Sequence, residues 1–89
     1  MGMERTENER KIVDKANFYF SEKVPAHVLI IPKGKFKNGL FVSDIQENKS
    51  GSYFWFIESD STIPIRLFLF EIYDIEDYQE MGDEKNVKN

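Results

Sequence analysis

The sequence predicts a mainly β fold, in which one N-terminal helix precedes a five-stranded, strongly bent antiparallel sheet closed into a small barrel. Three observations support this prediction. The chain has 89 residues, enough for one domain around one small core. Apolar residues recur at helical spacing near the N-terminus, and then at alternate positions from Val24 to Tyr78. Clusters of Gly, Asn, Asp and Ser divide that second part into short runs.

The helix is predicted over about residues 6–20. Thr6 and Glu9 have the spacing of a capping box, in which two side chains satisfy N–H groups that would otherwise lack partners. Because Pro25 disfavours helical geometry in the residue before it, we expect the helix to end near Phe20. The apolar residues that follow form one stripe along the helix: Ile12, Val13, Ala16, Tyr19 and Phe20.

Five runs of alternating apolar residues follow the helix. They are "VPAHVLII", "KFKNGLFVSDI", "SYFWFIES", "TIPIRLFLF" and "EIYDIEDY". In the third run, Tyr53, Trp55 and Ile57 oppose Phe54 and Phe56, so both faces are apolar. Such a sheet is expected to close into a barrel with the helix over one end. The single domain is expected to span residues 6–80, between disordered ends at 1–5 and 81–89.

The composition limits the compartment and the kinds of site. No cysteine is present, so the chain has neither a disulfide nor a thiolate metal site, which fits a reducing cytosol. The chain shows no signal segment, and no apolar run of the length that crosses a bilayer, which is about 18 residues. We therefore expect a cytoplasmic protein with no membrane association.

Basic residues concentrate in the middle of the chain. Residues 23–49 hold five basic and two acidic residues, whereas residues 50–89 hold three basic and nine acidic ones. Clustered lysines are what a polyphosphate requires, and Lys33, Lys35 and Lys37 alternate so that they project to one side. Lysines on a hairpin also deter pairing between sheet edges, which needs no ligand. Both interpretations remain open from the residues alone.

The stretch "KGKFKNGLFVSD" resembles the first motif of the Sm and Sm-like proteins, including the bacterial Hfq relatives. The resemblance covers roughly residues 6–78 and implies an N-terminal helix followed by a five-stranded SH3-like small barrel. Asn48, four residues after Asp44, resembles the Asp-x-x-x-Asn spacing of the motif, whose Asn binds a base in the RNA-binding members. The positions that match the rest of the motif are Gly34, Gly39, Leu40, Val42 and Asp44.

The second Sm motif is matched only in part. Ile65 and Arg66 resemble the Ile-Arg of the family's Ile-Arg-Gly, but Leu67 stands where the glycine belongs. The nearest resemblance is to small prokaryotic Sm-like barrels, for which the fold is implied and the activity is not.

Catalysis has little support in the sequence. His27 is the only histidine, and without a second His or a Cys it does not make a zinc site of the common kind. The serines lie in turn-like contexts with no matching base. The acidic cluster that ends the last run is typical of a solvated surface: Asp74, Glu76, Asp77 and Glu80. We expect no enzyme activity, no cofactor, no metal and no small-molecule substrate.

Two functions of different classes remain. The preferred one is an interaction or assembly barrel, with Ile65, Phe68 and Phe70 at an interface between copies; a dimer is preferred over a closed ring. The alternative is binding of single-stranded RNA. The residues that would contact RNA are Lys33, Lys35, Lys37, Asn48 and Arg66.

Overall fold

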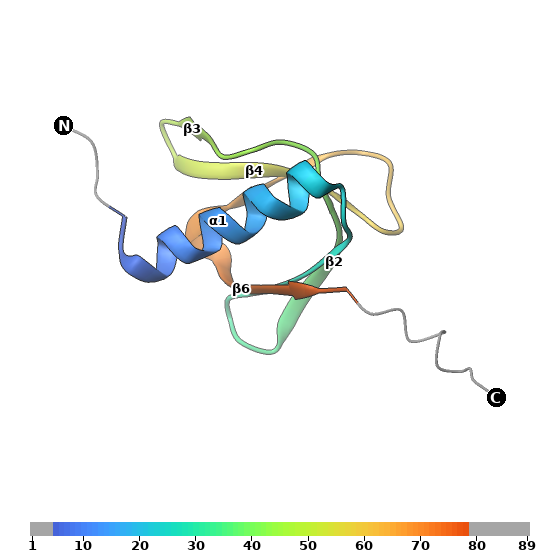
Figure 1. The fold of residues 1–89 in the computed structure, drawn as a ribbon, viewed down its shortest axis with the longest axis horizontal. Helices are drawn as coiled ribbons and strands as arrows, with labels where there is room; N and C mark the ends of the chain where they lie inside the picture. The colour runs from blue at the N-terminus through green and yellow to red at the C-terminus, as the bar shows by residue number, and fades with distance from the viewer. Residues whose placement is uncertain (1–4, 79–89) are drawn as a thin grey trace.

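The computed structural model describes residues 5–78, and it places one helix ahead of six strands (Figure 1). A mainly β fold with an N-terminal helix is therefore confirmed. The elements in chain order are α1 (Glu7–Glu22), β1 (Ala26–Ile30), β2 (Lys35–Phe41), β3 (Gln46–Asn48), β4 (Gly51–Glu58), β5 (Ile65–Phe68), the 3-10 helix η1 (Leu69–Glu71) and β6 (Ile72–Asp77).

Helix α1 begins as the capping residues predict. The Thr6 hydroxyl accepts a hydrogen bond from the Glu9 N–H, and the Glu9 carboxylate accepts one from the Thr6 N–H. The helix continues beyond the predicted end at Phe20 to Glu22, where Lys23 takes up the left-handed conformation with φ 58°. Pro25 restricts Val24, the residue before it, and this restriction falls outside the helix.

The strands form one antiparallel sheet in the order β3-β4-β2-β1-β6, with β5 also paired to β4. The sheet has six strands instead of the predicted five. The first strand formed by the second run, β2, ends at Phe41. The chain then turns and forms a further strand, β3, over Gln46–Asn48, which pairs with β4. The fourth run is strand only over Ile65–Phe68, because the chain then turns through η1. Within residues 5–78, β5 and β6 do not pair with each other, so hydrogen bonds do not close the sheet.

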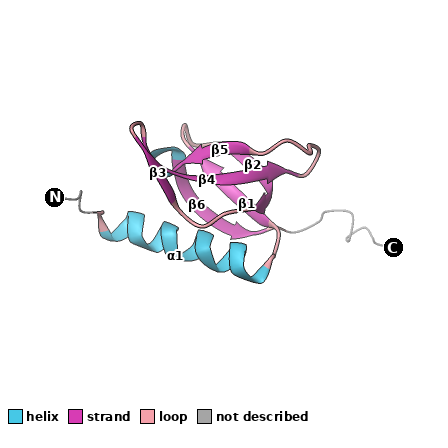
Figure 2. Ribbon diagram, turned by 90° about the horizontal axis from the view of Figure 1, so that it is seen from above, coloured by secondary structure: helices cyan, strands magenta, loops and turns pink. Residues whose placement is uncertain are grey.

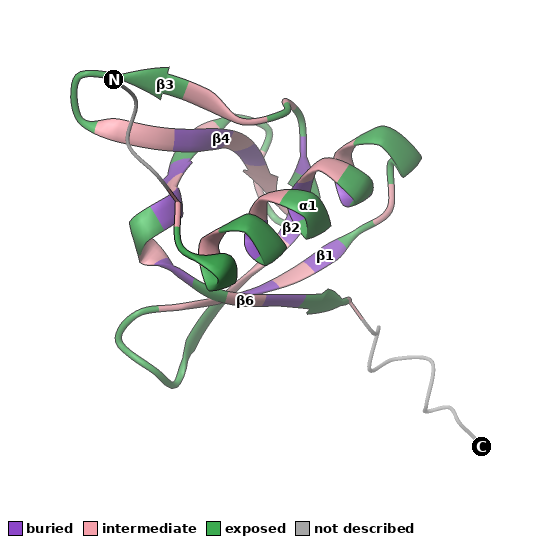
Figure 3. Cartoon of the chain, turned by 60° about the vertical axis from the view of Figure 1, so that its left-hand side comes forward, coloured by how far each residue is buried: buried purple, intermediate pink, exposed green. Residues whose placement is uncertain are grey.

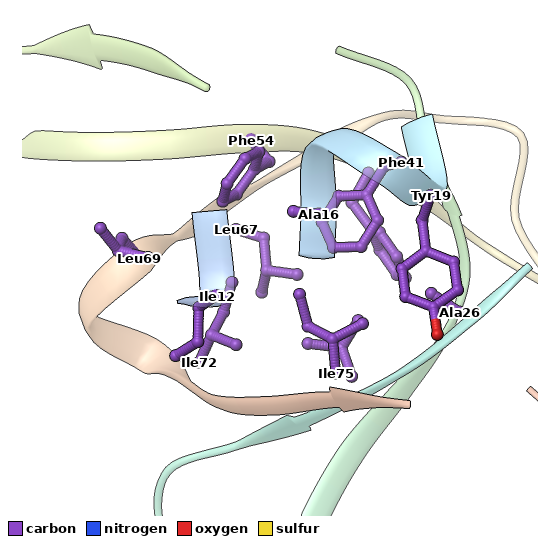
Figure 4. Packing of buried hydrophobic residues seen from close by; sticks show 12 residues of the cluster. Ile12, Ala16, Tyr19, Ala26, Phe41, Phe54, Leu67, Leu69, Ile72 and Ile75 are labelled. Carbon is purple, nitrogen blue, oxygen red and sulfur yellow. The ribbon is translucent and has the colours of Figure 1, made fainter. Parts of the chain in front are cut away.

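The strands curve around one apolar core, and α1 lies along one side of them (Figure 2). Buried positions recur along α1, β1, β4 and β6, and the other positions are exposed or half-buried on α1 and β6 and half-buried on β1 and β4 (Figure 3). Ile12, Ala16 and Tyr19 of α1 pack among the side chains that the sheet and η1 contribute (Figure 4). The fully buried large side chains are Phe54, Phe56, Leu67, Ile75 and Val28.

Gly39 is the point where β2 passes from pairing with β1 to pairing with β4. A Cβ on this residue would lie 2.1 Å from the carbonyl oxygen of Ile57, which no real contact allows. Glycine is therefore required there by the close approach of two backbones. The predicted disordered ends, 1–5 and 81–89, lie outside the described residues except for Arg5, whose guanidinium contacts Glu47 and Ser52.

Candidate functional site

Strand β4 divides its large side chains between the core and the outer surface of the sheet. Phe54 and Phe56 are completely buried in the core, whereas Tyr53 and Trp55 lie on the opposite side of the strand. The register pairs Tyr53 with Phe68 and Trp55 with Arg66, so β5 extends this outer surface. We call the resulting surface the aromatic face. It consists of Tyr53, Trp55, Arg66, Phe68 and Phe70.

The rings of the aromatic face form a continuous row. Tyr53 meets Trp55 edge to face, with 5.8 Å between ring centroids, and lies 5.6 Å from Phe68. Phe68 in turn stacks on Phe70 at 5.3 Å, with only 22° between the ring planes. Phe70 ends the row and remains 63% exposed. The row therefore leads from half-buried Trp55, through buried Tyr53 and half-buried Phe68, to a large apolar side chain in solvent.

Arg66 lies over Tyr53 and Trp55, at the end of this row away from Phe70. Its guanidinium carbon is 5.2 Å from the ring centroid of Tyr53 and 5.1 Å from that of Trp55, within the range of cation–π attraction. The side chain is exposed, and it forms no ion pair within residues 5–78. The rings hold the guanidinium in place while its N–H groups remain able to bind a carbonyl or a carboxylate.

An open pocket of about 650 Å³ adjoins the end of the row. Arg5 and Glu9 at the start of α1, the turn between β3 and β4, and Leu69 and Phe70 of η1 line it. Asn48 belongs to this pocket, and its Oδ1 accepts the N–H groups of Ser50 and Gly51 at 2.7 and 3.2 Å. This oxygen therefore closes the turn. Phe70 is the residue that joins the pocket to the aromatic face.

The basic residues lie elsewhere. Lys33 is in the turn between β1 and β2, where its ammonium nitrogen is 4.6 Å from the centroid of the Tyr73 ring. Lys35 and Lys37 share one side of β2, opposite Ile30 and Val28 of β1. Lys37 is partly covered and lies 3.4 Å from the carboxylate of Glu58. The structure thus does not bring the lysines together with Arg66 and Asn48 on one surface.

Of the three residues expected at an interface, two lie on the aromatic face and one faces the core. Phe68 and Phe70 are neighbours in the aromatic face. Ile65 is paired with the buried Phe56 and packs against the core, so its side chain does not contribute to that face. The aromatic face therefore unites Arg66, expected to contact RNA, with two residues expected at an interface.

Two polar side-chain contacts join helix α1 to β6. The Tyr19 hydroxyl donates to Asp77 at 2.5 Å, and the Lys15 ammonium lies 2.9 Å from the Asp74 carboxylate. Burial, reinforced by the neighbouring Asp77 carboxylate, raises the pKa of Tyr19 to about 12. Partial burial acts to raise the pKa of Asp74, but hydrogen bonds from Lys15 and from the Ile75 N–H outweigh it and lower that pKa.

The His27 side chain contacts Asn38 and Phe36. Its Nδ1 is within hydrogen-bonding distance of the Asn38 side-chain oxygen, and its ring is 4.7 Å from that of Phe36. Among residues 5–78, no three His, Asp or Glu side chains come together as metal ligands would. In the same part of the chain, no helix has the length and apolar character needed to cross a membrane.

Two features of the site were not predicted from the sequence. The alternation in "SYFWFIE" separates Tyr53 and Trp55 from Phe54 and Phe56, but it does not say which pair lies outside. The contact of Lys15 with Asp74 joins residues 59 positions apart in the sequence, so no local sequence pattern predicts it. Comparison with protein-family models, with curated proteins and with solved structures gave no match.

Proposed function

We propose that the chain is a non-enzymatic interaction or assembly module built on an Sm-like small barrel, and that it contacts its partner through the aromatic face. The order of helix and strands, together with the short 3-10 turn between β5 and β6, supports this barrel type. One observation carries the proposed function. Phe70 is 63% exposed and continues a row of rings across which an arginine is held.

Aromatic residues and arginine are the residue types enriched at the centres of protein interfaces. In the aromatic face, the exposed Phe70 stacks on half-buried Phe68, which in turn contacts buried Tyr53, so burying this surface would order few additional side chains. Arg66 adds a hydrogen-bonding group over the rings of Tyr53 and Trp55. These features suit a protein surface that presents apolar groups and a carbonyl or carboxylate.

The experiment places a photoreactive phenylalanine analogue at Phe70 and, in a matched control, at Phe18. Phe18 is 56% exposed on α1 and lies outside the aromatic face. We expect a discrete protein adduct in cells from position 70 and none from position 18. Equal labelling at the two positions, or no adduct at position 70, would contradict the proposed function.

Binding of single-stranded RNA is the second candidate, and a specific observation favours it. Exposed Phe70 stacks on Phe68 beside Arg66, which is an arrangement that can receive unpaired bases. The separation of the lysines from this surface argues against it. If RNA binds, replacing Lys33, Lys35 and Lys37 with Gln should lower the slope of log K against log salt by about one for each lysine that binds a phosphate. Absence of binding to a labelled oligouridine at low salt would eliminate this candidate.

A further inference from the structure

The outer edge of β5 carries backbone N–H groups that have no partner within residues 5–78. The Trp55 N–H donates to the Ser43 hydroxyl at 3.0 Å, and the Trp55 carbonyl accepts from the Val42 N–H at 2.9 Å. Both groups therefore point away from β5. Because the direction alternates along an antiparallel strand, Phe54 and Phe56 point toward β5 and bond to Leu67 and Ile65.

The same alternation fixes the direction of the other residues of β5. Arg66 directs its N–H and C=O groups, and Phe68 its N–H group, away from β4, toward the open side of the strand. The Phe68 C=O, at the N-cap of η1, also accepts the first hydrogen bond of that turn. In the described part of the chain, neither backbone N–H donates to any group. Pro64 shares this orientation and has no N–H, so a ladder on this edge can extend only over the short β5 segment. An unpaired edge of this kind is a template for a further strand.

The outer edge of β6 is different, because side chains of the same chain already occupy it. The Tyr78 N–H donates to the Pro25 carbonyl next to β1, so Ile75 points outward. The Ile75 carbonyl accepts from the Lys15 ammonium at 3.3 Å, and its N–H donates to the Asp74 carboxylate at 2.8 Å. A strand from another copy would have to displace both contacts.

We propose that the occupant of the β5 edge is β5 of a second copy, paired antiparallel about a two-fold axis at Leu67. This inference rests on the proposed function, since it names the partner of the aromatic face and its geometry. A head-to-tail contact of β5 with β6 of the next copy is disfavoured, because Lys15 and Asp74 cap β6. An isologous contact uses the uncapped edge twice.

The register follows from charge and from the position of the proline. With Leu67 on the axis, Arg66 of one chain is opposite Phe68 of the other, and the Phe68 N–H donates to the Arg66 carbonyl across the axis. The Phe68 carbonyl already accepts the first hydrogen bond of η1, so it receives the Arg66 N–H of the other chain on its second lone pair. The guanidinium then meets an aromatic ring, and the two aromatic faces become one surface. A shift that places Arg66 opposite its own copy would set like charges together and would pair Phe68 with Pro64, which has no N–H to donate.

The chain has no cysteine, so introduced cysteines report this register directly. The variants are Arg66→Cys and Phe68→Cys, with Phe36→Cys, at a 55% exposed ring of β2, as the control for random collision. In the proposed register, residues 66 and 68 of opposite chains have Cα atoms about 5.5 Å apart, whereas two copies of residue 66 are about 7–8 Å apart, too far for a disulfide. Mild oxidation of mixed variants is followed by intact mass under non-reducing conditions.

We expect the mixed disulfide of Arg66→Cys with Phe68→Cys to exceed each variant alone, and the Phe36→Cys control, by about tenfold or more. A dominant homodisulfide of Arg66→Cys would overturn the register. Mixed disulfide at the level of the control would overturn the β5 contact, provided that hydrogen exchange of the unaltered protein agrees. That exchange should slow at the Arg66 and Phe68 amides as the protein concentration rises, and unchanged exchange would contradict the proposal independently of any variant.

The failure of this inference differs from the failure of the proposed function. A chain that stays monomeric at every concentration, while position 70 crosslinks a different protein, would exclude the second copy and retain the interaction face. A chain that stays monomeric and gives no adduct at position 70 would contradict both.

Discussion

The two outer strands β5 and β6 are joined by one turn of 3-10 helix, yet their free edges have opposite properties. The edge of β6 is covered by α1, whose Lys15 binds the Ile75 carbonyl and whose Tyr19 binds Asp77. The edge of β5 presents the backbone of Arg66 and Phe68, beside a row of exposed and half-buried rings. Side chains of α1 and β6 therefore cover the backbone of the β6 edge, whereas the N–H groups of the β5 edge have no such cover within residues 5–78.

The largest expected effect tests the sheet that carries both edges. Gly39→Val should destabilise the protein by more than roughly 3 kcal/mol, beyond the usual range for overpacking, because its Cβ would lie 2.1 Å from the Ile57 carbonyl oxygen. Thermal unfolding followed by circular dichroism measures the change. The matched control is Lys37→Ala, which removes a partly exposed ion pair with Glu58 and should cost at most about 1 kcal/mol. Equal melting temperatures would contradict the register of β2 with β4.

The next largest effect on stability is expected at the contact of Tyr19 in α1 with Asp77 in β6. The raised pKa of Tyr19, about 12 against an ordinary value of 10.0, means that the folded state keeps a proton that the unfolded state loses. Stability from this group is complete below pH 10 and is lost as the pH rises toward 12, by an amount on the order of 2 kcal/mol. Tyr19→Phe should flatten the dependence of unfolding free energy on pH in this window. Parallel dependences of unfolding free energy on pH for the two proteins would mean that folding does not raise the pKa of Tyr19.

A smaller effect is expected at the aromatic face. Phe70→Ser should weaken self-association by about tenfold, because the Phe70 ring stacks on Phe68, the residue that pairs across the β5 edge in the proposed dimer. The ring is 63% exposed in the single chain, so the melting temperature of the diluted monomer should change little. Analytical ultracentrifugation and thermal unfolding separate these two quantities. Loss of folding in this variant would instead assign Phe70 to the core.

The smallest effect on stability is expected for the Lys15–Asp74 pair, which covers the β6 edge. The pKa of Asp74 is lowered in the folded state, so its contribution to stability is present at neutral pH and is lost as the pH falls through that lowered value. Because Lys15 and Asp74 are both substantially exposed, Asp74→Asn should cost less than about 1 kcal/mol at pH 7. The variant should also reduce the decline of stability in acid. An unaltered acid profile would show that the pair contributes nothing measurable.

The sequence was sufficient for the elements that depend on local chemistry. Thr6 and Glu9 predicted the start of α1, and the apolar stripe predicted Ile12, Ala16 and Tyr19 in the core. The number of strands was wrong, because the bend after Phe41 divides one apolar run into two strands, and alternation alone does not locate a bend. The 3-10 turn at Leu69 was missed for a similar reason: the run "RLFLF" keeps a strand-like pattern through it.

The candidate site was accessible from the sequence only in part. Phe68 and Phe70 were predicted at an interface between copies, and both belong to the aromatic face. The grouping of Arg66 with Asn48 and the lysines was a prediction from resemblance and composition, and the structure places the lysines apart from Arg66. The capping of Ile75 by Lys15 depends on how α1 lies against β6, which is a tertiary property without a local signal.

The most direct measurement of the central claim is the mass of the protein in solution as a function of concentration, for the unaltered chain and for Phe68→Pro. The Phe68 backbone, with φ −77° and ψ 143°, accommodates proline, so the variant removes the edge N–H without straining the backbone. We expect the unaltered chain to approach twice its mass of 10.5 kDa, whereas the variant remains a folded monomer. Association of the variant as strong as that of the unaltered chain, or a larger ring-sized mass for either protein, would contradict pairing through the β5 edge.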